Sequence, residues 1–88
     1  MAEREVTIVN KLGIHARPAA EIVKTCAKFK SAITIIRDEL EVNAKSIMGV
    51  MMLAAEKGAK ITLRAEGPDA DAALDALAAL IAGKFGES

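Results

Sequence analysis

The stretch GIHARPAAEIVKTCAKF, residues 13–29, predicts the first helix of the fold. Its apolar side chains recur at helical spacing at Ala19, Ile22, Val23, Cys26 and Phe29. Pro18 suits the first turn of a helix, because the N–H group that proline lacks would have no acceptor there. We therefore expect the helix to begin close to residues 15–17, with His15 at or near its N-cap.

Four segments outside this helix predict strands, because they carry alternating or β-branched apolar side chains. They are residues 5–9, 32–37, 40–43 and 60–66. The join between the second and third segments, residues 37–39, lacks the Asn-Gly or Asp-Gly pair of the tightest hairpins, so that turn is predicted from its flanking strands.

Two further helices are predicted from residues typical of helix ends. Ser46 is a favoured N-cap and Gly58 a favoured C-terminal glycine, so we expect a helix between them. Asp69 is the expected N-cap of a last amphipathic helix, whose buried side carries Leu74, Leu77 and Ile81. The order β-α-β-β-α-β-α predicts an open two-layer sandwich, with helices on one face of a four-stranded sheet.

The bulk composition limits the class of protein. A chain of 88 residues suits a single domain over residues 1–88. Its 12 basic and 12 acidic side chains, with no Trp or Tyr, do not suggest a nucleic-acid binder. No apolar run reaches the ~18 residues of a membrane span, and the start MAEREV lacks a signal-peptide core. We expect a cytoplasmic protein with no metal site, and the single Cys26 agrees with a reducing compartment.

His15 is the only histidine in the chain, and Arg17 follows it closely. A helix N-terminus attracts anions, because its first N–H groups point outward and its dipole is positive there. The planar guanidinium of Arg17 suits phosphate oxygens. The same positive field disfavours an imidazolium, so we expect a neutral His15 that can attack a phosphoryl group. This motif by itself leaves a solvated or purely capping histidine as an equal alternative.

Two motifs stand out, GIHARPA at residues 13–19 and KSIMGVM at residues 45–51, and KGAKITLRAEG at 57–67 supports them. With these motifs the chain closely resembles HPr, the histidine-containing phosphocarrier family of the bacterial phosphoenolpyruvate-dependent sugar phosphotransferase system. The resemblance covers nearly the whole chain. It implies an α+β fold with an antiparallel sheet in the order 1-4-2-3 and three helices on one face.

The resemblance also implies a phosphorelay intermediate rather than a self-standing enzyme, with no cofactor. Enzyme I would donate a phosphoryl group to Nδ1 of His15, Arg17 would stabilise the phosphate, and IIA domains of sugar permeases would receive it. Ser46, which also serves as a helix cap, would be the regulatory site of an HPr kinase/phosphorylase. A catabolite-control regulator is a further candidate partner, and we expect a monomer.

A docking surface around His15 is also implied. Its residues would be Leu12, Ala16, Ala20, Ile47, Met48, Met51 and Met52. Helical spacing places Val50 and Leu53 in the core and puts Met48 and Met52 on another face. Exposed methionine suits a surface that accepts several partners, whereas simple core packing is the alternative. Leu12 is apolar where the family commonly has a small or polar residue, which could alter partner preference.

Other functions stay open at this point. A regulatory binding module would act mainly through Ser46 and partner docking, but we would expect such a paralogue to lack the histidine. A small ligand-binding domain has no support, because the chain has no phosphate loop of the G-x-x-x-x-G-K type. Sugar uptake, a nitrogen-related relay and catabolite control are not distinguished, nor are the sugars.

Overall fold

A computed structural model describes residues 1–86 of the chain. The elements follow in the order β1 (Ala2–Thr7), α1 (Ala16–Cys26), β2 (Ala32–Arg37), β3 (Leu40–Asn43), α2 (Ile47–Met52), β4 (Lys60–Glu66), α3 (Ala70–Ala82) and a 3₁₀ helix η1 (Lys84–Gly86). This is the predicted order β-α-β-β-α-β-α, with η1 added at the end.

The four strands form one antiparallel sheet in the order β1-β4-β2-β3, as predicted. Strand β4, one of the two inner strands, pairs with β1 from Ala2 opposite Ala65 to Thr7 opposite Lys60. Its side chains alternate, so that Ile61, Leu63 and Ala65 are buried while those between them are partly exposed. One face of the sheet is therefore apolar and must be covered.

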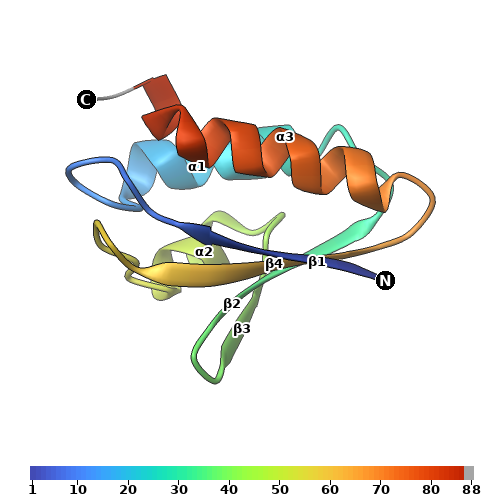
Figure 1. Ribbon diagram of the computed structural model, residues 1–88, viewed down its shortest axis with the longest axis horizontal. Helices are drawn as coiled ribbons and strands as arrows, with labels where there is room; N and C mark the ends of the chain where they lie inside the picture. Colours follow the sequence, from blue (N-terminus) through green and yellow to red (C-terminus); the bar gives the residue numbers. More distant parts are fainter. Residues whose placement is uncertain (87–88) are drawn as a thin grey trace.

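The helices supply that cover, and Figure 1 shows α1 and α3 lying across the same face of the sheet. From α1, Ile22 and Cys26 are fully buried, and from α3, Leu74, Leu77 and Ile81 reach the same core. Phe85 in η1 is also buried, at the end of α3. No helix among residues 1–86 is long and apolar enough to span a membrane.

The first strand lies earlier in the chain than predicted, at Ala2–Thr7 rather than residues 5–9. Its partner β4 begins at Lys60, which stands opposite Thr7, so the ladder ends there. The following residue, Ile8, still exchanges hydrogen bonds with the turn before β4: its N–H donates to Ala59 at 2.9 Å, and Gly58 donates to its carbonyl at 2.7 Å. The alternation at residues 5–9 identified the strand but not its pairing limits.

The helix that Ser46 opens is also shorter than predicted, because α2 ends at Met52 and Gly58 does not terminate it. Leu53 is the C-cap, and the next residue, Ala54, turns the chain with a left-handed backbone (φ 49°). Helices commonly end in such a residue, although glycine is usual there. Gly58 instead forms the turn before β4, with φ 92°.

Asp69 is the N-cap residue of α3, as expected, but its carboxylate binds elsewhere. It accepts hydrogen bonds from the backbone N–H groups of Lys30 and Ser31, each at 2.9 Å, and from the Ser31 hydroxyl. These bonds lower the pKa of Asp69 to about 2, and the bond from the Ser31 side chain has the largest effect. The residue therefore connects the start of α3 to the segment before β2.

Candidate functional site

His15 is the N-cap residue of α1, where the sequence placed it. Its backbone is extended (φ −105°, ψ −165°), and its carbonyl accepts the N–H of Ala19 at 3.0 Å as the helix begins. Pro18 is fully buried in the first turn. The imidazole is half-buried and therefore lies at the surface beside the start of the helix.

The turn before His15 is held by its own hydrogen bonds. The N–H of Gly13 donates to the carbonyl of Asn10 at 3.1 Å, and Nδ2 of Asn10 donates to the carbonyl of Gly13 at 2.7 Å. Gly13 has a left-handed backbone (φ 70°), which favours glycine. Residues 10–13 were predicted as a break after the first strand, but no role at the site was predicted for Asn10, although an asparagine three residues before a glycine is a recognisable turn signal.

A second segment supports this turn from the side. The N–H of Ile14 donates to the carbonyl of Ala55 at 2.8 Å. Gly13 lies so close to this segment that a Cβ atom there would overlap the Ala55 carbonyl oxygen and lie 2.8 Å from Cα of Glu56. The residues before His15 are therefore positioned by the chain that follows α2, which no sequence pattern indicated.

Arg17 is exposed in the first turn of α1, and that turn holds no acidic residue. The N–H groups at the start of a helix have no acceptor within it, and the helix dipole makes that end positive. His15 thus lies where a helix end and a nearby guanidinium both favour negative charge. The arrangement is chemically suited to a histidine that carries a phosphoryl group for a short time.

Ser46 is the N-cap residue of α2, and its hydroxyl accepts the N–H of Gly49 at 3.1 Å. The capping role expected from the sequence is therefore present. The side chain is half-buried, and the next two residues, Ile47 and Met48, are exposed. A charged group added to Ser46 would lie beside an apolar surface.

Helix α2 carries four large apolar side chains that are exposed. Among residues 1–86, seven large apolar residues are exposed, and all except Met1 and Leu40 belong to the predicted docking surface. Met48 and Met52 are 78% and 65% exposed, whereas Val50 and Leu53 are buried as helical spacing predicted. We call the exposed set the apolar patch; its members are Leu12, Ile47, Met48, Met51 and Met52.

The patch lies on elements that are in contact with one another. Helix α1 contacts α2, and Leu12 belongs to the turn that precedes His15. Of the two alanines predicted to join the docking surface, Ala16 is exposed and Ala20 is half-buried. A contiguous exposed apolar surface is typical of interaction sites.

The remaining candidate chemical groups do not add to this site. Cys26 is buried in the core, and its burial raises the pKa of its thiol to about 11, a shift that Lys45 partly opposes. A buried thiol with a raised pKa is unreactive. Within residues 1–86, no group of three or more His, Cys, Asp or Glu side chains is placed to hold a metal ion.

Comparison with known proteins gives a consistent result. Residues 2–83 match the family model described as "PTS HPr component phosphorylation site". The chain is 52% identical over 87 residues to phosphocarrier protein HPr of Cupriavidus necator, covering 99% of this chain and 98% of that protein. It is 48% identical over 86 residues to phosphocarrier protein NPr of Shewanella violacea, covering 98% and 94% of the two chains.

The fold also matches a solved structure of such a protein. A crystal structure of HPr from Thermoanaerobacter tengcongensis superposes with a TM-score of 0.96 at 50% identity, covering 100% of this chain and 99% of that one. The strand order and the set of three helices are therefore those of a solved phosphocarrier structure.

Proposed function

The chain belongs to the HPr family of phosphocarriers of the phosphotransferase system, and on that premise we propose that His15 is the residue that carries the phosphoryl group. Enzyme I is the proposed donor, and IIA domains of sugar permeases are the proposed acceptors. In the first step, an imidazole nitrogen of His15, Nδ1 in the family, forms a bond to phosphorus. The bond between phosphorus and the donor breaks, and its electron pair stays with the donor. The second step transfers the group onward in the same way.

The observation that carries this proposal is the position of His15 at the N-cap of α1, with Arg17 in the first turn and no acidic residue there. A phosphorylated imidazole is anionic, and this end of the helix favours an anion. The helix dipole contributes only about 0.3–1 kcal/mol per charge, and up to about 2 kcal/mol. Stabilisation of that size favours a group that can be passed on rather than one that is trapped.

The apolar patch supports a carrier that meets its partners in turn. Donor and acceptor must both approach His15, so one surface has to serve both. Long, flexible methionine side chains adapt to differently shaped partners. We propose that Met48 and Met52 provide this adaptable contact and that the working form is a monomer in the cytoplasm, with the patch free for its partners.

We also propose that Ser46 is a regulatory phosphorylation site for an HPr kinase/phosphorylase, with a catabolite-control regulator as a further partner. A phosphate on Ser46 carries about two negative charges at neutral pH. Placed next to exposed Ile47 and Met48, those charges would oppose docking of a partner that contacts the patch. Regulation of this kind acts on the interface and leaves the fold in place.

The test is transfer of label from phosphoenolpyruvate through purified enzyme I. We expect wild-type protein to carry a label that is lost in acid and retained in base, as for a phosphoramidate. His15→Asn keeps a side chain that is favoured at an N-cap, so it should fold normally and carry no label. Arg17→Lys keeps the charge but loses the planar fork and should slow transfer by about 10- to 150-fold, the rate equivalent of one charge-assisted hydrogen bond of about 1.5–3 kcal/mol.

The matched control for Arg17 is Arg64→Lys, on the sheet face away from the helices, where Arg64 pairs with Glu3 at 2.8 Å. Wild-type transfer in this control shows that the loss belongs to the site. Full labelling of His15→Asn would refute the carrier proposal. Label that resists acid and depends on Ser46 would instead support the alternative, a regulatory module that acts through Ser46 and docking.

A further inference from the structure

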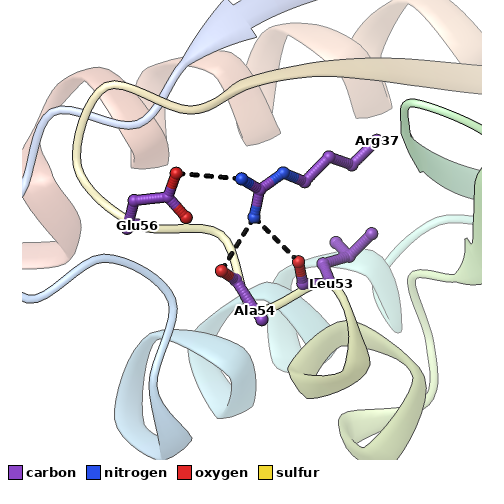
Figure 2. A network of polar contacts seen from close by, with 4 residues as sticks. All are labelled: Arg37, Leu53, Ala54 and Glu56. Carbon is purple, nitrogen blue, oxygen red and sulfur yellow. Dashed lines mark hydrogen bonds and ion pairs between the residues drawn. The ribbon is translucent and has the colours of Figure 1, made fainter.

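Arg37, the last residue of β2, binds the chain segment that follows α2 (Figure 2). Its Nη1 donates to the carbonyl of Leu53 at 3.0 Å and to that of Ala54 at 2.8 Å, and its Nη2 pairs with Oε1 of Glu56 at 2.9 Å. The guanidinium thus makes three contacts within a segment of four residues. We call this set of contacts the Arg37 clamp.

The segment needs such a partner. The last carbonyls of a helix have no donor within it, and a cation near them is favourable. Helix α2 has no basic residue in its last turn, so Arg37 supplies the cation from another element. Ala54 holds a left-handed backbone (φ 49°) that non-glycine residues disfavour, which requires support from its surroundings.

Glu56 completes the clamp by orienting the guanidinium. The side chain of Arg37 is only 25% exposed, whereas that of Glu56 is 66% exposed. A hydrogen bond from its own backbone N–H and the bond from Arg37 together lower the pKa of Glu56. Its carboxylate is therefore charged at neutral pH, and the pair keeps the fork of Arg37 directed at the two carbonyls.

The clamped segment is the one that supports the turn before His15. Ala55 lies between the clamped residues Ala54 and Glu56, and its carbonyl accepts the N–H of Ile14 at 2.8 Å. Backbone atoms of Ala55 and Glu56 also pack against Gly13. Arg37 thus binds the residues on either side of Ala55, and Ala55 in turn binds Ile14, the residue that precedes His15.

We propose that Arg37 is a positioning residue for phosphoryl transfer at His15, a proposal that rests on His15 being the acceptor. Arg37 contacts none of the proposed reacting atoms. It acts by holding Ala55 where its carbonyl fixes Ile14 and hence the start of α1. Transfer requires the attacking nitrogen to be aligned with phosphorus, and a displacement of about 1 Å far from the reaction can lower the rate by about 100-fold.

Loss of the clamp should affect the transfer rate more than docking, because Arg37 is not part of the apolar patch. The experiment compares Arg37→Ala and Arg37→Lys in transfer from labelled enzyme I, with Arg64→Ala as the matched control. Arg64 is also an arginine of a strand paired with glutamates, Glu3 and Glu41, but it lies on the sheet face away from His15.

We expect Arg37→Ala to lower the maximal transfer rate by about 3- to 30-fold, with less than about a twofold change in the carrier concentration that gives half-maximal rate. Arg37→Lys should recover part of the loss, because it restores the charge but not the three-contact fork. Hydrogen exchange of the Ile14 amide should speed up in Arg37→Ala by a similar factor while core amides of β4 keep their protection. Arg64→Ala should match wild type in all three measurements.

Several results would overturn the proposal. A wild-type transfer rate in folded Arg37→Ala, with His15→Asn inert, would show that Arg37 has no positioning role although His15 is the acceptor. Equal acceleration of exchange at Ile14 and in β4 would show a purely structural role. Full labelling of His15→Asn would remove the proposed function itself, and with it the role of Arg37 in transfer.

Discussion

Replacing Gly13 with alanine tests the support of the turn before His15 directly. Gly13 has a left-handed backbone (φ 70°), and it lies against the backbone of Ala55 and Glu56. A methyl group there would overlap the Ala55 carbonyl oxygen, the atom that accepts the N–H of Ile14. The substitution therefore combines an unfavourable conformation with a clash against main-chain atoms, which cannot rotate away.

The expected loss of stability has two parts. A left-handed backbone costs alanine about 1–2 kcal/mol. Alanine also lowers the conformational entropy of the unfolded chain relative to glycine, which offsets about 0.4–1 kcal/mol of that cost. The clash forces a shift of backbone, for which about 1–3 kcal/mol is typical. A small domain has about 5–15 kcal/mol in total, so the variant should fold but be clearly weakened.

Gly58→Ala is the matched control, because it isolates the conformational part. Gly58 also has positive φ, at 92°, but nothing lies within 4 Å of the position of its added Cβ atom. Urea unfolding of both variants, with unchanged m-values, gives the two free energies. We expect Gly13→Ala to lose about 1–3 kcal/mol more than Gly58→Ala, which is the cost of the clash.

Transfer measured on the folded variants adds a second readout. Gly13→Ala should slow phosphoryl transfer at His15, because the clash moves Ile14 away from Ala55, while Gly58→Ala should not. Equal losses of stability in the two variants would refute the tight contact between Gly13 and the segment after α2. Normal transfer in a destabilised Gly13→Ala would refute the link from that contact to His15.

Three further predictions concern the patch, its regulation and the start of α3. Met48→Glu should weaken binding to enzyme I and to IIA domains together, because the proposed patch would serve both. It should change the free energy of unfolding by no more than about 0.5 kcal/mol; a large loss of stability in urea would show that Met48 supports the core. Ser46→Asp should keep thermal stability, because aspartate also caps helices, but weaken enzyme I binding in calorimetry, more so at low salt; normal affinity would reduce Ser46 to a cap. The pKa of Asp69 is lowered from 3.8 to about 2 on folding, so the stability it provides is present above about pH 4 and is lost as pH falls towards 2. Ser31→Ala removes the leading cause of that shift and should flatten the pH dependence of unfolding between pH 4 and 2, whereas an unchanged profile would contradict the assignment to Asp69.

Local patterns in the sequence were enough to predict much of the fold. The strands at residues 32–37, 40–43 and 60–66 have the predicted limits, because their apolar alternation is bounded by clear breaks. The start of α1 was predicted from Pro18, whose fixed φ and missing N–H suit only the first turn. Helical spacing alone placed Met48 and Met52 on a different face from Val50, which is buried, but it left open whether that face was exposed.

The strand order 1-4-2-3 came from the resemblance to the HPr family rather than from any pattern in the residues. The candidate site residues likewise fall into those predicted from the residues themselves and those implied by the family. Position and spacing alone predicted His15 and Arg17 as an anion site, whereas the regulatory role of Ser46 and the members of the docking surface were implied by the family.

Other features depended on contacts between segments that are distant in sequence. The end of β1 is set by the point where β4 begins, and a strand carries no local record of its partner's limits. Helix α2 ends at Met52 because the chain turns at Ala54, where Arg37 from β2 binds the exposed carbonyls. Residue preferences at helix ends favoured Gly58 as the residue that terminates α2. They take no account of a cation, here Arg37, that comes from a strand distant in sequence.

The clearest example of such a contact is the support that the segment after α2 gives to the turn before His15. Residue type and spacing were enough to predict an anion site at His15 and Arg17, because both residues lie at the start of one helix. The atoms that hold the preceding turn belong to Ala55 and Glu56, about forty residues later. Backbone carbonyls are the same in every residue, so a main-chain hydrogen bond between distant segments leaves no mark in residue identity and exists only once the sheet and helices have packed.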